Sequence, residues 1–191
     1  MKEHFGSLLL DHAFETEVAV TPLSGPAPPN ACPPGFAKHA FEYAFRIDAP
    51  RASVWTWLED PNTFVRGQIW PFRVEFLSTD PSVPPGFSTG GLNIHHGPLM
   101  CFAGQLGEIR EGAYRCLHYF YGSYVLSLRL IRPTALEFWV DDAPGGGTHV
   151  RLRVSSFVHR RFARGWSLLQ GRFWKRFPRW MSSALGARLL E

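Results

Sequence analysis

The sequence of 191 residues has few cysteines, no long apolar run and no phosphate-binding loop. Cys32, Cys101 and Cys116 are an odd number without a Cys-x-x-Cys pair, which argues against a disulfide framework and a zinc ribbon. No run of about 18 apolar residues occurs, and residues 1–20 lack the continuous apolar core of a signal peptide. The glycines at 145–147 are followed by neither Lys-Ser/Thr nor a helix, so they predict a turn. These absences predict a soluble protein of a reducing cytoplasm.

Metal ligands are also scarce, and the sequence predicts neither a metal site nor a cofactor. His95 and His96 are adjacent, but neighbouring residues of a strand point to opposite faces, so at most one of them faces inward. No carboxylate or cysteine lies near them at the spacing of a zinc site.

Positive charge is concentrated at one end of the chain. The net charge is +4, of which residues 160–191 carry +7, so the remainder carries −3. A basic character confined to one segment argues against a general nucleic-acid-binding surface. It fits a solvated helix face or a surface that binds an anionic membrane.

The same basic segment, from Arg160 onward, has the period of a long amphipathic helix. Its apolar residues recur at steps of three and four and predict one buried face: Phe162, Trp166, Leu169, Phe173, Phe177, Trp180 and Ala184, widened by Trp174, Met181 and Leu185. The opposite face is basic: Arg161, Arg164, Arg172, Lys175 and Arg179. Pro178 inside this segment predicts a kink or a break.

Alternating patterns predict strands before that helix. Residues 41–47 and 70–76 alternate, and Asp48-Ala49-Pro50 between them starts a short helix that buries Val54, Trp57 and Leu58. From Phe87 six further strands are expected: 87–96, 101–110, 113–121, 123–132, 134–140 and 148–158. The turn signals between them include Gly122 and Pro133, and all are short enough for antiparallel neighbours.

These elements predict an α+β fold in which a curved antiparallel sheet wraps around the C-terminal helix. Residues 39–191 form the expected domain, and residues 1–38 are an N-terminal extension. Six prolines between residues 22 and 36 make part of that extension a stiff linker or a surface wrap. Residues 1–21 have mixed helical and strand patterns.

The order of elements resembles the helix-grip (SRPBCC) superfamily, which includes START domains, the birch-pollen allergen family and bacterial polyketide cyclase/dehydratase proteins. The resemblance covers about residues 40–191 and rests on "APRASVWTWL" at 49–58, with "GEIREGAYRCLHY" at 107–119 as weaker support. It implies an apolar cavity between the sheet and the last helix. Members bind or transfer lipids, sterols, polyketides or quinones, and some are cyclases or hydrolases. The superfamily has no common catalytic residues to carry over.

Large aromatic side chains at inward positions are the expected ligand-binding residues of that cavity. They are Trp57, Phe64, Trp70, Phe72, Phe102, Tyr119, Phe138, Trp166, Phe173 and Phe177.

Polar strand residues are the candidates for chemistry. Arg73, Glu75, Arg115 and His118 could reach the cavity and orient a ligand carbonyl or act as acid or base, although the first three also fit salt bridges on the outer face. Cys101 or Cys116 could form a thiolate–imidazole pair with His118, or be structural cysteines.

Three functions therefore stay open from the sequence. The first is a carrier or sensor of an apolar small molecule, the second is a cyclase/dehydratase- or hydrolase-type enzyme, and the third is a peripheral membrane adaptor that uses the basic helix face.

Overall fold

The computed structural model describes residues 31–66, 73–78, 80, 82, 86–97, 100–124, 127 and 129–190. The expected elements within residues 1–30 lie outside this range. The strands are β1 (Phe36–Ile47), β2 (Arg73–Leu77), β3 (Leu92–Gly97), β4 (Met100–Arg110), β5 (Tyr114–Tyr124), β6 (Ile131–Asp142), β7 (Thr148–His159) and β8 (Leu189–Leu190). The helices are α1 (Arg51–Glu59), α2 (Pro61–Arg66), η1 (Arg160–Phe162), α3 (Ala163–Trp174) and α4 (Phe177–Leu185).

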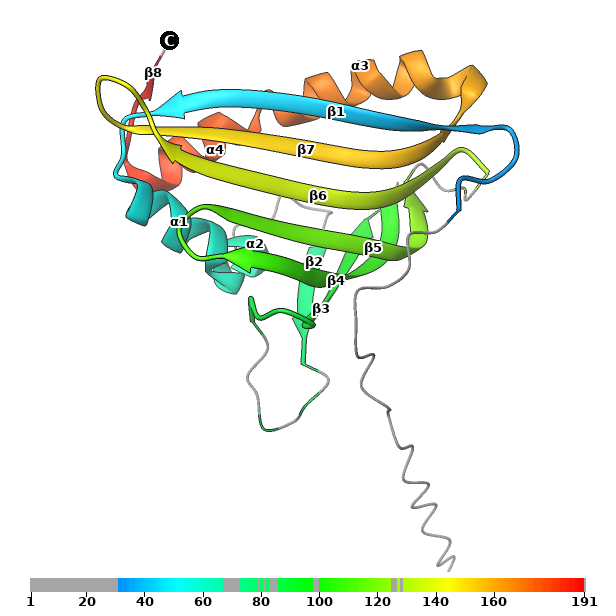
Figure 1. Cartoon of the computed structure of the whole chain (residues 1–191), viewed down its shortest axis with the longest axis horizontal. Helices are drawn as coiled ribbons and strands as arrows, with labels where there is room; N and C mark the ends of the chain where they lie inside the picture. The colour runs from blue at the N-terminus through cyan, green and yellow to red at the C-terminus, as the bar shows by residue number, and fades with distance from the viewer. Residues whose placement is uncertain are drawn as a thin grey trace, which may run out of the picture.

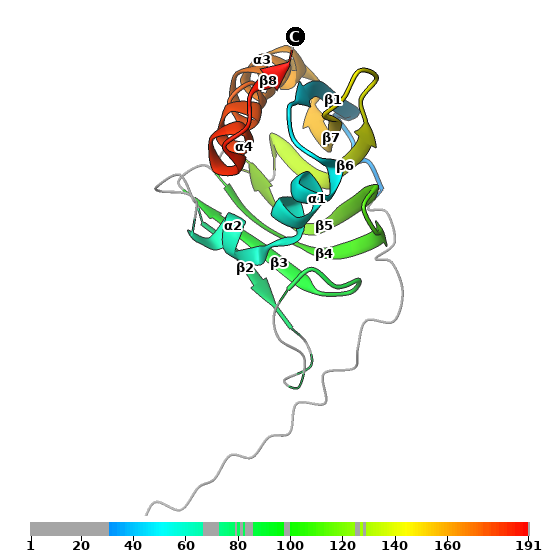
Figure 2. The same ribbon diagram turned by 90° about the vertical axis from the view of Figure 1, so that its left-hand side faces the viewer.

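All eight strands belong to one antiparallel sheet in the order β2-β3-β4-β5-β6-β7-β1-β8 (Figure 1). Figure 2 shows the sheet curving from β1, beside α3 and α4, round to β2 and β3 on the far side of the interior. We call the face toward the helices the inner face. The α+β architecture predicted from the sequence, with a curved sheet around a C-terminal helical segment, is confirmed.

Alternation over residues 148–156 of β7 shows how the sequence selects the inner face. Val150 and Leu152 are fully buried, whereas Arg151 between them is exposed. Because successive residues of a strand point to opposite faces, this period of two separates a dry side from a wet side. The inner-face residues of β6, β7 and β1 pack against α1 and α4 in the largest core cluster.

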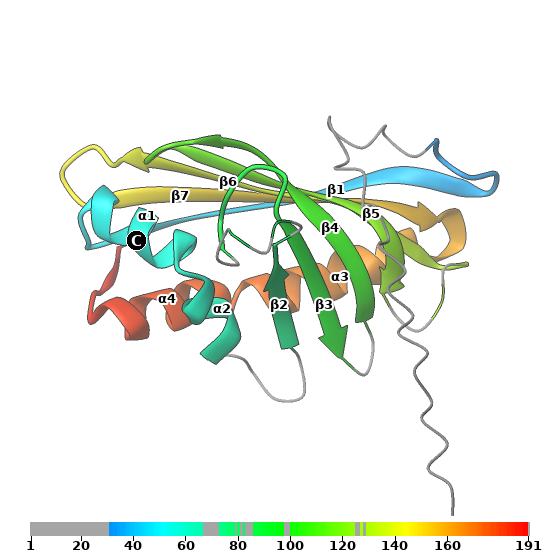
Figure 3. The same ribbon diagram turned by 90° about the horizontal axis from the view of Figure 1, so that it is seen from below.

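The predicted helical turns after β1 are present as α1 and α2. Val54, Trp57 and Leu58 are buried as expected, and Trp55 is buried beside them. Asp60 separates the two helices, and its Oδ1 accepts a hydrogen bond of 2.8 Å from the Asn62 N–H at the start of α2. Figure 3 shows α1 and α2 at the same end of the sheet as α4.

The predicted break at Pro178 is confirmed, because the C-terminal segment is two helices, α3 and α4, separated at Lys175 and Arg176. Proline has no N–H for the hydrogen bond to the residue four positions earlier, and its ring clashes with that carbonyl. Pro178 instead stands in the first turn of α4, where that N–H is not needed.

The predicted buried stripe of this segment is partly wrong. Leu169 and Phe173 are 45% and 49% exposed, and the buried residues at this level are Gln170 and Trp174. The Trp174 Nε1–H donates to Gln170 Oε1 over 2.7 Å, so the buried amide oxygen has its hydrogen bond. Turning the helix this way buries an indole instead of a phenyl ring, and the larger apolar surface favours it.

One predicted strand is also wrong. The expected strand 123–132 is divided between two strands, because β5 runs through Gly122 to Tyr124 and β6 begins at Ile131, and the described residues 127, 129 and 130 between them are not in a strand. Gly122 has a φ of 101°, which glycine tolerates without ending the strand. Pro133 lies inside β6 next to a register shift between Pro133 and Ala135, where a missing N–H is least costly.

Candidate ligand-binding site

The predicted ligand-binding aromatic residues are distributed over three buried clusters of the inner face. Trp57, Phe138 and Phe177 share one cluster, Phe102 and Tyr119 share a second, and Trp166 belongs to a third with Ile131 and Val158. Trp70, Phe72 and the side chain of Phe64 lie outside the described residues. The prediction that Phe173 faces inward is wrong, because its side chain is about half exposed.

A buried asparagine, Asn93 on β3, lies beside the second cluster and was not among the predicted site residues. Its side chain is fully buried, and neither Oδ1 nor Nδ2 has a hydrogen-bond partner among the described residues. The register places Asn93 between Phe76 on β2 and Gly104 on β4, and Gly104 is paired with Tyr119 on β5. A buried amide without partners costs about 1 to 3 kcal/mol, so this position is unfavourable for folding alone.

His95 and Tyr119 supply two more hydrogen-bonding groups beside Asn93. The His95 ring stacks on Phe102 with 4.5 Å between centroids, and its Nε2 lies 3.4 Å from the Tyr119 hydroxyl. Burial, with a smaller contribution from His96, lowers the pKa of His95 to about 3. The imidazole is therefore neutral at physiological pH. His96 is exposed and lies 3.6 Å from Glu75, which agrees with the prediction that at most one of the two histidines faces inward.

Gly104 makes the approach of Tyr119 possible. A Cβ at position 104 would lie 2.4 Å from the His118 carbonyl oxygen and 2.7 Å from Cδ1 of Tyr119. Real Cβ atoms do not tolerate such distances, so any other residue would displace the β5 backbone or the tyrosine ring. Glycine at this place lets the Tyr119 ring lie over β4 with its hydroxyl beside His95.

Arg115 lies on the inner face, which corrects the expectation of a salt bridge on the outer face. It is 2% exposed, and its guanidinium carbon is 4.5 Å from the ring centroid of Phe87 and 4.8 Å from that of Phe138. Burial lowers the pKa of Arg115 to about 9, against the opposing influence of Tyr119 and Glu59. A cation held between two aromatic faces therefore lies within the apolar interior.

The other polar candidates point to the outer face. Arg73 and Glu75 form the predicted salt bridge, with 2.7 Å between Nη2 and Oε1. His118 lies beside Cys116, with 3.5 Å between Nε2 and the sulfur, on the face opposite Arg115 and Tyr119. Burial raises the pKa of Cys116 to about 12, so its thiol stays protonated and the proposed thiolate–imidazole pair is not supported.

The described residues contain no group of three or more His, Cys, Asp or Glu side chains arranged to hold a metal ion. The polar groups around Asn93 are instead neutral hydrogen-bonding groups. An amide, an imidazole and a hydroxyl lie at the edge of a surface of aromatic rings, and one cation lies farther along the same face. Such a surface can hold a flat apolar molecule and orient a carbonyl or a hydroxyl on it.

Sequence reasoning missed Asn93, although one signal was present. Asn93 and His95 alternate with Leu92 and Ile94, so two polar side chains point to the same face of the strand. Asparagine is disfavoured in strands, which makes its presence there a signal. The sequence alone does not say whether that face is the inner or the outer one, because this depends on the partner strands.

The chain matches no protein-family profile and no curated protein sequence. Its fold is similar to an uncharacterized protein from Rhizobium leguminosarum, with a TM-score of 0.58 and 14% identity over 79% of this chain and 96% of that one. It is also similar to truncated norcoclaurine synthase from Thalictrum flavum, with a TM-score of 0.57 and 8% identity over 79% of this chain and 96% of that one. A complex of norcoclaurine synthase with dopamine and hydroxybenzaldehyde gives a TM-score of 0.55 at 11% identity, over 79% of this chain and 88% of that one. These neighbours have the helix-grip fold, and at such identities they show the fold alone.

Proposed function

We propose that the protein binds an apolar small molecule in a cavity between the inner face of the sheet and the C-terminal helices, as a carrier or a sensor. The observation that carries the proposal is Asn93, a fully buried amide whose two polar atoms have no partner among the described residues. A ligand carbonyl or hydroxyl would satisfy that amide, and the neighbouring rings of Phe102 and Tyr119 would contact the ligand's apolar body.

The charges of the surrounding groups favour binding over acid–base catalysis. A general acid or base works best when its pKa is near the working pH. The pKa of His95 is lowered to about 3 and that of Arg115 remains at about 9, so both keep one protonation state near neutrality. Glu59 is the carboxyl group whose charge raises the pKa of Arg115. The pKa of Glu59 itself is raised, mainly by burial and then by Glu111.

One structural neighbour shows that a protein of this fold can hold small molecules. The norcoclaurine synthase complex contains dopamine and hydroxybenzaldehyde, which are small aromatic molecules with polar substituents. A ligand of this chemistry, an apolar body with one or two oxygen functions, matches the groups around Asn93.

The test compares two buried amides with opposite hydrogen-bond status. Asn93→Leu removes an unpartnered amide, so we expect it to stabilise the fold by about 1 to 3 kcal/mol while weakening saturable binding of the neutral fluorophore Nile red. Gln170→Leu removes an amide that accepts from Trp174, so we expect it to destabilise the fold and to leave Nile red binding unchanged.

The measurements are urea denaturation for stability and a fluorescence titration for binding. Asn93→Val, with a smaller side chain, tests whether any loss of stability in Asn93→Leu comes from overpacking. Destabilisation in both Asn93 variants together with unchanged Nile red affinity would show a structural amide and would remove the proposal.

A second candidate function, peripheral binding to an anionic membrane, is favoured by the outer side of α3. Leu168 is 69% exposed, and Leu169 and Phe173 are about half exposed on the same helix. Arg164 and Arg172, one turn before and after Leu168, are exposed as well. Exposed apolar side chains among cations are typical of helices that lie in the membrane interface. None of the described helices is long and apolar enough to cross a bilayer.

Vesicle sedimentation with phosphatidylglycerol vesicles tests this candidate. Neutralising Arg161, Arg164, Arg172, Lys175 and Arg179 together should abolish salt-sensitive binding. Leu168→Ser with Phe173→Ser should weaken binding at all salt concentrations, because the apolar contribution is not screened. If the unaltered protein does not sediment with the vesicles, the arginines form a solvated face.

A further inference from the structure

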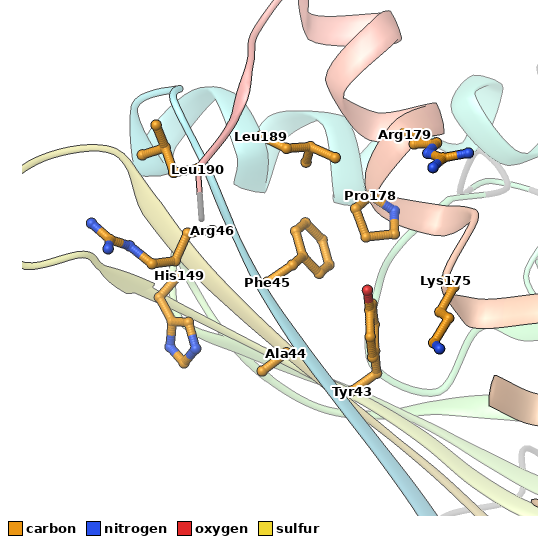
Figure 4. Close-up of a pocket in the computed structure, with 10 residues that line it drawn as sticks. All are labelled: Tyr43, Ala44, Phe45, Arg46, His149, Lys175, Pro178, Arg179, Leu189 and Leu190. Atoms are coloured by element: carbon orange, nitrogen blue, oxygen red, sulfur yellow. The ribbon is translucent and has the colours of Figure 1, made fainter.

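A groove of about 560 Å³ lies outside the inner-face site, where the β1 edge meets the junction of α3 and α4 (Figure 4). Its walls come from four elements that are far apart in the sequence: the end of β1, the start of β7, the α3–α4 junction and β8. The volume is within the range of small-molecule sites, about 300 to 1,000 Å³.

The floor of this groove is apolar. Figure 4 shows the Phe45 ring at its centre, with Tyr43 on one side and Leu189 and Pro178 above. The Phe45 ring is fixed from behind, because its centroid lies 6.2 Å from that of Phe177 in an edge-on contact with the core. The floor is therefore a rigid patch of ring and aliphatic surface.

The rim carries basic side chains at both ends. Lys175 and Arg179 lie at one end, and Arg46 and His149 lie at the other, where both side chains point away from the Phe45 ring (Figure 4). The Arg46 guanidinium is held by a hydrogen bond of 2.8 Å from Nη2 to the Pro144 carbonyl oxygen. No acidic side chain is among the lining residues, and none of these basic groups forms an ion pair with a described residue. The groove therefore combines apolar surface with positive charge that no described carboxylate neutralises.

We propose that this groove is a second binding site, for a small organic anion with an apolar body and one acidic group. The apolar body lies on Phe45, Pro178 and Leu189, and the acidic group is held by Lys175 and Arg179. Opposite charge selects the acidic group, and the aromatic floor selects the apolar body. Neither contact involves Asn93, His95 or Tyr119, so this site is independent of the one proposed on the inner face.

The probe is dodecanoate below its micellar concentration, measured by isothermal titration calorimetry, with dodecanol as the uncharged analogue. We expect saturable binding of one dodecanoate and binding of dodecanol at least about threefold weaker. Lys175→Gln with Arg179→Gln should weaken dodecanoate binding by at least about threefold, because two exposed cations are removed. Leu189→Asp, which adds a carboxylate to the groove, should weaken it further.

The matched control is Arg160→Gln with Arg164→Gln, which removes the same charge from exposed positions at the opposite end of the helical segment. This control and Asn93→Leu should bind dodecanoate like the unaltered protein, and the Lys175/Arg179 variant should keep its Nile red affinity. Circular dichroism confirms that each variant is folded.

Four calorimetric outcomes would overturn the proposal. They are the absence of saturable dodecanoate binding, equal affinities for dodecanoate and dodecanol, equal losses in the control and groove variants, and a loss confined to Asn93→Leu. Binding of phosphatidylglycerol vesicles through Lys175 and Arg179 without binding of free dodecanoate would assign these cations to a membrane surface and would also overturn it.

Discussion

Phe173 and Phe177 flank the break between α3 and α4 and offer a matched pair of truncations. Phe177 is 6% exposed, and its ring centroid lies 5.4 to 6.2 Å from those of Trp174, Phe138, Trp180, Trp57 and Phe45. Cutting it to alanine removes one ring from the centre of five others. Such a change in a filled core costs about 3 to 5 kcal/mol, through lost burial and a new void.

Phe173→Ala removes the same atoms from a half-exposed position. Complete burial of a phenylalanine side chain contributes about 1.5 to 3 kcal/mol to stability, so truncating a half-buried one should cost about half of that, about 1 kcal/mol. The truncation leaves no enclosed void, because the ring borders solvent. The two variants should therefore differ by about 2 to 4 kcal/mol.

Urea denaturation followed by tryptophan fluorescence measures both values. In a chain of this size each kcal/mol corresponds to about 2 to 4 °C, so the Tm of Phe177→Ala should fall by about 6 to 20 °C. Equal losses for the two variants would refute the placement of the helix stripe. A loss below about 2 kcal/mol for Phe177→Ala would show that its ring borders empty space, because a residue at a cavity already lacks contacts on one side.

Three further predictions follow from the same structure. Stability should fall as the pH drops from about 6.5 toward 4.5, because the unfolded chain protonates a histidine whose folded pKa is about 3, and this histidine contributes up to about 1.4 kcal/mol per pH unit. Burial also lowers the pKa of His39, so His95→Gln should reduce this slope without abolishing it, and His96→Gln should leave it unchanged. Ellman's reagent at pH 8 should modify two thiols of the native protein, Cys32 and Cys101, whereas modification of a third would contradict the burial and raised pKa of Cys116. Deleting residues 1–30 should leave the Tm within about 2 °C if these residues are an extension outside the domain, and loss of cooperative unfolding would show that they belong to it.

The sequence could predict those features that depend on the period of one segment. The inner face of β7 follows from alternation alone, since Val150 and Leu152 are apolar and Arg151 and Arg153 are charged. The helix break follows from Pro178, because the missing N–H has the same effect in any helix.

Features that depend on contacts between segments could not be predicted. A stripe through Trp166, Phe173 and Phe177 and a stripe through Trp166, Trp174 and Phe177 both have steps allowed by a helix, and only packing against the sheet selects the second. Arg115 faces inward because of its register with Phe138, and the groove at Phe45 exists because β8 returns to the end of β1. Neither pairing has a signal in a single sequence.

The position of β1 in the sheet has a consequence for how the chain reaches its native state. Phe36 is paired with His159 and Ile47 with Thr148, so the hydrogen-bond partners of β1 are synthesised more than a hundred residues later. Pairing strands that are so far apart in the sequence costs a large loop-closure entropy before any contact forms, so such pairing slows folding. During synthesis β1 has no partner strand until β7 has left the ribosome, and Phe41, Tyr43 and Phe45 remain uncovered for that time. We therefore expect folding to begin in the local hairpins from β3 to β7 and to end with the docking of β1, α3 and α4, and this last step sets the period in which the chain is open to aggregation.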